Sequence, residues 1–242
     1  MRCWVDTDVG DDPDDMVALA CAAAHPDVEL VGVSTIGRDP HDSSRRAEFA
    51  RTVVPGVQVV AGPPPPDALA VCDALLLIGP WTHGGAVAAT GVLPRRVVAM
   101  GGALAPVRHR GTVVVVEHNV GTDPAAAAAV LRAADDLLVV PLDVTASLHC
   151  TDEEEADLVA RLPGLADALG RWRARRGRVP FVLHDPAALL ACCGEPSLRV
   201  EPASVVVDGD GRVRRDRAGT PVHVVVAADR DRLVARVRAL LG

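Results

Sequence analysis

The chain contains no lysine and no tyrosine, and asparagine and glutamine occur once each among its 242 residues. All 25 basic residues are therefore arginine, and the formal net charge is -7. An acidic balance of this kind argues against a dedicated nucleic-acid-binding protein. No apolar run approaches the roughly 18 residues of a membrane span, so we expect no membrane partner either.

A signal peptide and a disulfide framework are also not expected. Asp6 follows the first residue so closely that a signal peptide has no room. The six cysteines show neither the spacing of a metal finger nor that of a disulfide-stapled domain. We therefore expect a reduced, cytoplasmic protein in which the cysteines are small core residues. The length and the 49% hydrophobic content favour one large domain over residues 1–242.

The residue that the chain has in excess is aspartate, because six aspartates lie between Asp6 and Asp15. The apolar start Cys3-Trp4-Val5 indicates a short buried strand, and Met16 to Ala24 indicates a helix. The acidic loop between them lies where open α/β sheets bind ligands. Helix capping accounts for one or two of these aspartates but not for six. Clustered carboxylates therefore predict a divalent-metal site, with Ca²⁺ or Mg²⁺ favoured over softer metals.

Strand and helix patterns alternate along the chain. After the first strand, further strands are expected over residues 28–35, 57–61, 74–78, 96–100, 112–116, 137–140 and 222–226. Helices are expected over 16–24, 42–53, 124–134 and 152–162, around Trp172, after Asp185 and over 229–241. Continuous apolar strands with helices between them predict an α/β fold, with a mostly parallel open sheet covered on both faces and a Rossmann-like core.

Polar residues follow several of these strands and can converge on one rim of the sheet. They are Asp6 and Asp8, Gly37-Arg38, the turn 79–82, Gly101-Gly102, the segment 117–119 and His184-Asp185-Pro186. Asn119 is the only asparagine of the chain, which favours a role in a site over the alternative that it only satisfies a turn.

The order of these motifs resembles the inosine-uridine preferring nucleoside hydrolase family. The N-terminal block Asp6-Thr7-Asp8-Val9-Gly10 followed by Asp14-Asp15 is similar to the family's D-x-D-x-G and D-D hallmark. The later matches, in the family's order, are Gly79-Pro80-Trp81-Thr82, Met100-Gly101-Gly102-Ala103, Glu117-His118-Asn119 with Asp123-Pro124, and His184-Asp185-Pro186. The resemblance therefore covers residues 3 to about 190 and implies the fold of that family.

The resemblance also implies an activity. It implies hydrolysis of the N-glycosidic bond of a ribonucleoside or related N-ribosyl compound, as in purine or pyrimidine salvage, giving free base and ribose. The small-molecule ribosyl substrate would bind beside a Ca²⁺ ion, with Mg²⁺ as the alternative. A homo-oligomer is expected at the level of the family only.

Roles of individual residues follow from the same resemblance. The implied metal ligands are Asp8, Asp15, Thr82 through its carbonyl, and Asp185. The residues implied to hold ribose hydroxyls are Asp14, Glu117 and Asn119. Asp8 would also activate the attacking water as general base, and His184 would protonate the leaving base. A ring of carboxylates suits this reaction because positive charge develops on the ribosyl ring.

The chain departs from the family pattern at several positions. The stretch Asp11-Asp12-Pro13 lengthens the acidic loop, and Arg38 and His83 stand where asparagine is usual. The loop at residues 108–112 lacks the asparagine expected for the ribose 5′-hydroxyl, and the segment 62–75 is short. Substrate identity is therefore open.

These departures motivate one hypothesis about the substrate. Arg38, Arg108 and Arg110 would meet an anionic group at the 5′ end, because arginine binds phosphate through paired hydrogen bonds. The alternative is a solvated arginine loop in a protein whose only basic residue is arginine.

Two other functions remain as alternatives. A phosphatase of the D-x-D type would use Asp6 and Asp8 as nucleophile and acid/base, but this chemistry normally needs a basic residue, usually lysine, which the chain lacks. A catalytically inactive protein that binds metal and a ribosyl ligand is the second alternative, motivated by the short segment 62–75.

Overall fold

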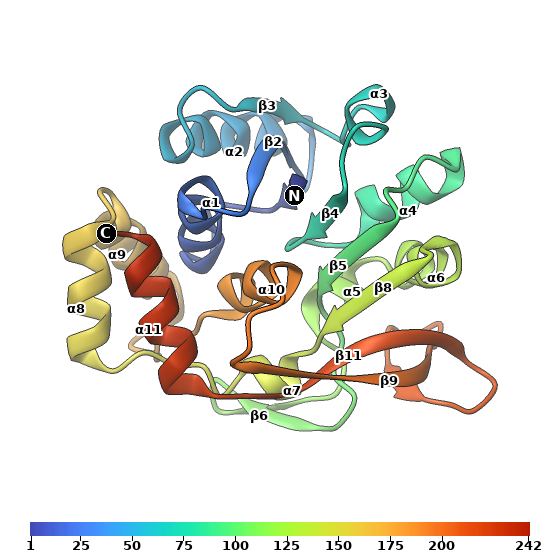
Figure 1. Cartoon of the computed structure of the whole chain (residues 1–242). Helices are drawn as coiled ribbons and strands as arrows, with labels where there is room; N and C mark the ends of the chain where they lie inside the picture. Colours follow the sequence, from blue (N-terminus) through green and yellow to red (C-terminus); the bar gives the residue numbers. More distant parts are fainter.

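A computed structural model describes residues 1–242, and its central feature is a nine-stranded sheet (Figure 1). The strand order is β10-β9-β11-β8-β5-β4-β1-β2-β3. The strands are β1 (Arg2–Thr7), β2 (Glu29–Thr35), β3 (Gln58–Ala61), β4 (Ala74–Leu77), β5 (Arg96–Met100), β8 (Asp136–Val140), β9 (Leu198–Val207), β10 (Val213–Arg215) and β11 (Thr220–Ala228). A separate hairpin consists of β6 (Val107–His109) and β7 (Thr112–Val114).

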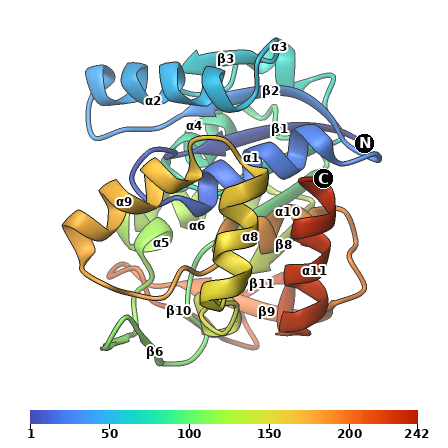
Figure 2. The same cartoon turned by 90° about the vertical axis from the view of Figure 1, so that its left-hand side faces the viewer.

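Helices cover both faces of the sheet, and none of them is both long and apolar enough to cross a membrane. The helices are α1 (Asp14–Ala24), α2 (Pro40–Val53), α3 (Pro66–Leu69), α4 (Thr82–Thr90), α5 (His118–Thr122), α6 (Pro124–Ala133), α7 (Leu142–Thr145), α8 (Asp152–Arg161), α9 (Leu165–Arg176), α10 (His184–Cys192) and α11 (Arg230–Leu240). Side chains of α1, α8, α9, α10 and α11 share the larger apolar core on one face, in front in Figure 2. Those of α4 and α6 pack in the smaller core on the other face. The expected α/β fold is confirmed.

Parallel pairing brings the carboxyl ends of the central strands to one edge of the sheet. β1 pairs in parallel with β2 and β4, and β5 pairs in parallel with β4 and β8. The residues that directly follow these strands therefore lie next to one another, as the sequence predicts. β5 has the bounds expected from the sequence, and the other expected strands agree to within a few residues.

The antiparallel extension of the sheet is the part that the sequence reading missed. β9 pairs antiparallel with both β11 and β10, and its ten residues include Pro202, which argues against a central strand. β10 pairs only with residues 205–207 of β9, so Pro202 lies on a free edge where a missing N–H costs no ladder bond. The turn at residues 208–211, which contains two aspartates and two glycines, closes this hairpin.

A series of linked hydrogen bonds fixes the end of β1 that leads into the acidic loop. The Trp4 indole lies over Gly32 of β2 and donates through Nε1 to Ser34 Oγ, 3.0 Å away. Ser34 in turn donates to Asp6, whose side chain is fully buried and also lies 2.9 Å from His83 Nδ1. Asp6 is therefore part of the scaffold beneath the loop.

Replacing Gly32 by alanine is expected to destabilise the fold, because the added Cβ would lie 2.3 Å from the Trp4 ring. Overpacking of this kind costs about 1–3 kcal/mol. Gly170→Ala in α9 is the matched control, because no atom lies within 4 Å of its added Cβ and alanine favours helix by about 1 kcal/mol. Urea unfolding should move the two midpoints in opposite directions. Equal midpoints for Gly32→Ala and wild type would contradict the close contact.

Candidate active site

A cavity of about 1030 Å³ opens at the carboxyl edge of the parallel strands. Its lining includes most of the residues that the sequence singled out: Asp8, Asp14, Asp15, Arg38, Thr82, Arg110, Glu117, Asn119, His184 and Asp185. Arg108 is the exception, because it is exposed and its guanidinium donates to the carbonyl of Gly111 instead. No Phe, Tyr or Trp side chain lines the cavity.

The floor of the cavity is a group of buried carboxylates. Asp14, Asp15 and Asp185 are each no more than 5% exposed, and one carboxylate oxygen from each lies within 4.8 Å of the other two. Asp14 and Asp15 begin α1, whereas Asp185 lies in the first turn of α10, so the N-termini of two helices meet here. Both helix dipoles favour negative charge at this point.

Backbone and hydroxyl donors hold these carboxylates in place. Asp14 Oδ2 accepts hydrogen bonds from the backbone N–H groups of His184 and Asp185, at 3.1 and 3.3 Å. Asp15 accepts a hydrogen bond from the hydroxyl of Thr7, the last residue of β1. None of the three forms an ion pair with a basic side chain, so their mutual repulsion is not neutralised within the protein.

The pKa values of the floor reflect this crowding. Burial raises the pKa of Asp8 to about 6, although Arg46 acts to lower it. Burial is also the main cause that raises the pKa of Asp14 to about 7. For Asp15 and Asp185, burial and the charges of the neighbouring aspartates raise the pKa well above the usual range. A positive charge at this floor would lower these pKa values, because it favours the ionised carboxylates.

Asp8 and Thr82 approach the floor from two neighbouring strand ends. Asp8 directly follows β1 and is partly buried, and Thr82 begins α4 after the turn that follows β4. Gly79 in this turn is required for the approach, because a Cβ there would lie 2.8 Å from the backbone nitrogen of Asp8. The polar edge of the cavity therefore depends on one close contact between β1 and β4.

Glu117 and Asn119 form a second polar wall and are also structural. The Glu117 carboxylate caps α5 by accepting from the backbone N–H groups of Asn119 and Val120, and it accepts from Gly102 N–H at 2.9 Å. Asn119 donates from Nδ2 to the carbonyl of Met100 at 3.2 Å. Burial raises the pKa of Glu117, although these backbone donors oppose the shift.

His184 begins α10 and is held by a buried partner. Its Nδ1 lies 2.8 Å from the hydroxyl of Thr145, which is fully buried. His109 of β6 packs edge-on against the His184 ring, with ring centroids 5.0 Å apart. Burial, with His109 and then Arg110 adding positive surroundings, holds the pKa of His184 well below its usual range. The imidazole is therefore neutral at pH 7.

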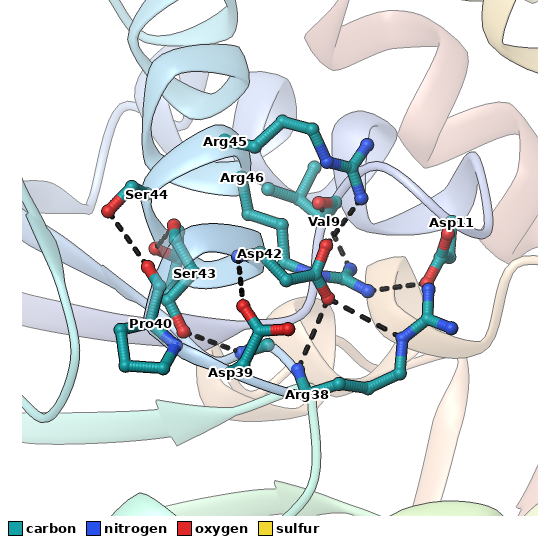
Figure 3. A network of polar contacts seen from close by, with 12 residues as sticks. Val9, Asp11, Arg38, Asp39, Pro40, Asp42, Ser43, Ser44, Arg45 and Arg46 are labelled. Carbon is teal, nitrogen blue, oxygen red and sulfur yellow. Dashed lines mark hydrogen bonds and ion pairs between the residues drawn. The ribbon is translucent and has the colours of Figure 1, made fainter.

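The two extra aspartates of the acidic loop do not join the floor. Asp11 pairs with Arg46 of α2, and Arg175 of α9 donates to its backbone carbonyl. Asp12 pairs with Arg110 of the β6–β7 hairpin at 2.9 Å. Figure 3 shows Asp11 with Arg46 and the neighbouring residues of α2. The loop insertion thus ties three separate elements around the cavity mouth.

Arg110 has a further contact that orients it. Its guanidinium lies 5.1 Å from the centroid of the Trp172 ring, and its own backbone has a positive φ of 48° at the hairpin turn. Positive φ at a residue other than glycine is uncommon and marks a fixed turn. The hairpin therefore presents His109 and Arg110 to the cavity while Arg108 faces away.

Several lining residues were given no site role from the sequence, among them Arg46, His109, Arg175 and Arg176. The three arginines lie on helices outside the recognised motifs, and arginine is too frequent here to be informative, whereas His109 lies between Arg108 and Arg110 in the loop already singled out. Asp6, in contrast, belongs to the scaffold and does not line the cavity. Its complete burial argues against the phosphatase alternative, in which Asp6 would be an exposed nucleophile.

The donor set fits a hard divalent cation. Asp8, Asp14, Asp15 and Asp185 supply carboxylate oxygens, and the nearby arginines pair with Asp11, Asp12 and Asp42 instead. Oxygen ligands of this kind suit Ca²⁺ and Mg²⁺. The aspartate cluster can therefore bind a metal ion.

Comparisons with known proteins agree with this geometry. The model of a family described as inosine-uridine preferring nucleoside hydrolase matches residues 90–235. No curated protein matches the chain by sequence. The solved inosine-uridine preferring nucleoside hydrolase from Bacillus anthracis has a TM-score of 0.76 at 21% identity, covering 99% of this chain and 98% of that one.

Two further solved structures are similar over nearly their whole length. The purine-preferring ribonucleoside hydrolase from Gardnerella vaginalis has a TM-score of 0.75 at 19% identity, covering 100% of this chain and 99% of that one. A plant nucleoside hydrolase has a TM-score of 0.76 at 19% identity, covering 99% and 98%. At these identities the structural likeness establishes the fold, and the family match over more than half of the chain establishes its membership. The chain belongs to the inosine-uridine preferring nucleoside hydrolase family, whose members hydrolyse N-glycosidic bonds.

Proposed function

We propose that the chain is a Ca²⁺-dependent ribonucleoside hydrolase in which Asp8 activates the attacking water. The observation that supports this most is the group of buried, unneutralised carboxylates on the floor of the cavity, at the strand ends where the family motifs lie. The products are the free base and ribose. A homo-oligomer and a place in nucleoside salvage are part of the proposal at the level of the family.

The metal is proposed to be Ca²⁺, with Mg²⁺ as the alternative. Asp8, Asp15, Asp185 and the carbonyl of Thr82 would hold it. A set of carboxylate and carbonyl oxygens suits Ca²⁺, which takes six to eight oxygen ligands in flexible geometry, whereas Mg²⁺ usually keeps several waters. When bound, the ion supplies the positive charge that lowers the pKa of a coordinated water.

Asp8 is proposed as the general base. Its carboxylate lines the cavity and forms no hydrogen bond or ion pair within the protein, so it is available to accept a proton. A cation bound beside Asp8 would keep its carboxylate ionised, which is the form that accepts a proton. The acidic floor then stabilises the positive charge that develops on the ribosyl ring.

Asp14, Glu117 and Asn119 are proposed to orient the ribose. Asp14 faces the cavity next to Asp185, and the fixed carboxylate and amide of the second wall lie in the same cavity. Because Glu117 and Asn119 are already held by backbone groups, they keep their orientation without the substrate. Pre-organised groups of this kind reduce the cost of ordering the ribose.

His184 is proposed to serve the leaving base. A neutral imidazole whose Nδ1 accepts from Thr145 carries its hydrogen on Nε2, which can then donate to a nitrogen of the base. Because the low pKa keeps His184 neutral, its role would be to donate a hydrogen bond to the departing base, and the proton that completes the base would come from solvent.

Asp8→Asn is expected to lower kcat by about 10²–10⁴-fold, because it removes the proposed proton acceptor. Release of reducing sugar from a panel of ribonucleosides, with Ca²⁺ and after chelation, measures this directly. Asp67→Asn is the control, because Asp67 is exposed on α3 and away from the cavity. Undiminished turnover in Asp8→Asn would rule out Asp8 as the base.

His184→Ala is expected to slow hydrolysis of natural nucleosides by about 10²–10⁴-fold while sparing a substrate whose leaving group needs no proton. Inosine and 4-nitrophenyl riboside form the matched pair of substrates. An equal loss for both compounds would show that the side chain acts on folding or ribose binding, and not on the leaving base.

The chelated protein is expected to lose stability as the pH rises from 5 to 8. Asp8 and Asp14 titrate at about 6 and 7 in the fold but near 3.8 in the unfolded chain, so the fold is favoured by protons that leave across this window. Each 1 kcal/mol lost lowers Tm by about 2–4 °C. Ca²⁺ should therefore raise Tm more at pH 8 than at pH 5. A Ca²⁺ effect that is the same at both pH values would contradict a role for these carboxylates in metal binding.

A further inference from the structure

The charge of the cavity is divided between floor and mouth. Its floor carries carboxylates, whereas five arginines contribute to the lining nearer the exposed loops: Arg38, Arg46, Arg110, Arg175 and Arg176. They come from the β2–α2 loop, α2, the hairpin and α9, so several elements contribute positive charge to the same opening. A cavity with an acidic floor and a basic mouth suits a substrate that becomes positively charged in one part and carries a negative charge in another.

Two of these arginines are already neutralised within the protein. The Arg46 side chain is only 4% exposed and pairs with both Asp11 and Asp42. Arg110 pairs with Asp12 and stacks on Trp172. They shape the mouth but have little capacity left for another anion.

The guanidinium groups of the other three arginines still have N–H donors that could bind an anion. The Arg38 side chain is 80% exposed and approaches only Asp42, at 3.7 Å, although that carboxylate already accepts from Arg45 and Arg46. Figure 3 shows the Arg38 side chain next to Asp42. Its backbone N–H is bonded to Asp42, so the guanidinium and not the backbone is the free donor.

The α9 side of the mouth is similar. A guanidinium nitrogen of Arg175 lies 3.6 Å from Asp11 Oδ1. The hydrogen bond of Arg175 goes to the backbone carbonyl of Asp11, which carries no net charge. Arg176 lines the cavity, is exposed, and makes no hydrogen bond or ion pair. Around Asp11 and Asp42, four guanidinium groups (Arg38, Arg45, Arg46 and Arg175) therefore surround two carboxylates.

We propose that the substrate carries an anionic group, which Arg38, Arg175 and Arg176 bind at the mouth while the ribosyl ring lies on the acidic floor. This inference rests on the proposed function and narrows its substrate class. The anion is a phosphate or a carboxylate, both of which match the planar donor pairs of arginine. It belongs either to the ribose, as a 5′-phosphate, or to the base, as a ring carboxylate.

Uridine, uridine 5′-monophosphate and orotidine test the proposal, because they share one ring system and differ in the presence and place of the anion. At least one anionic compound should exceed uridine in kcat/KM by about tenfold or more, the effect of one charge-assisted hydrogen bond. Preference for the monophosphate identifies the ribose end, and preference for orotidine identifies the base. The preference should fall as salt is raised, since the arginines at the mouth are exposed.

Alanine substitutions test whether the arginines cause the preference for an anionic compound. Arg38→Ala and Arg176→Ala should each reduce the ratio of kcat/KM for the preferred anionic compound over uridine by about tenfold. Arg178→Ala is the matched control, because Arg178 is 90% exposed, lies just beyond α9 and does not line the cavity. It should leave the ratio unchanged.

Failure of this inference is distinguishable from failure of the proposed function. Hydrolysis of all three compounds at equal kcat/KM would overturn the anion site and leave the hydrolase proposal standing. If neither these three compounds nor the panel of ribonucleosides is hydrolysed, the hydrolase proposal fails, and calorimetric affinities of the three compounds decide the inference. Tighter binding of an anionic compound, weakened in Arg38→Ala and Arg176→Ala, supports it, whereas equal or absent binding overturns it.

Discussion

Mutual repulsion among buried carboxylates is the constraint on which the rest of the site depends. Asp14, Asp15 and Asp185 lie within 4.8 Å of one another, and the protein supplies only helix dipoles and hydrogen-bond donors to stabilise them. Dipoles and neutral donors are worth far less than a full charge in a buried place. The aspartate cluster is consequently a place where a cation can bind and offset this repulsion.

The arginines are arranged so that they do not supply this charge themselves. Arg46 and Arg110 both border the cavity, but Asp11 and Asp12 intercept them through ion pairs. The ion pairs thus give the inserted residues Asp11 and Asp12 a structural role that differs from helix capping and from metal binding. The insertion holds the guanidinium groups of Arg46 and Arg110 in ion pairs with Asp11 and Asp12, and it ties α2 and the hairpin to the loop.

The sequence predicted the floor of the site better than its mouth, and the reason is geometric. Asp8 and Thr82 follow parallel strands, whose carboxyl ends meet at one edge in any sheet of this kind, so their proximity required no knowledge of loop structure. Asp185 could be placed because its motif begins a helix. The β9–β10 extension was missed because Pro202 and the charged residues around it are untypical of a strand, and only the free edge makes them acceptable.

The mouth is less predictable because backbone turns decide which side chains face it. Arg108 and Arg110 lie two residues apart, yet the turn at Arg110 directs one guanidinium to Asp12 and leaves the other outside the cavity. Arg176 comes from α9, far along the chain. The sheet edge therefore positions the carboxylates of the floor, whereas the hairpin, the β2–α2 loop, α2 and α9 position the arginines of the mouth. The ion pairs of Asp11 and Asp12 lie between the two sets of charges, because they join the acidic loop to α2 and to the hairpin.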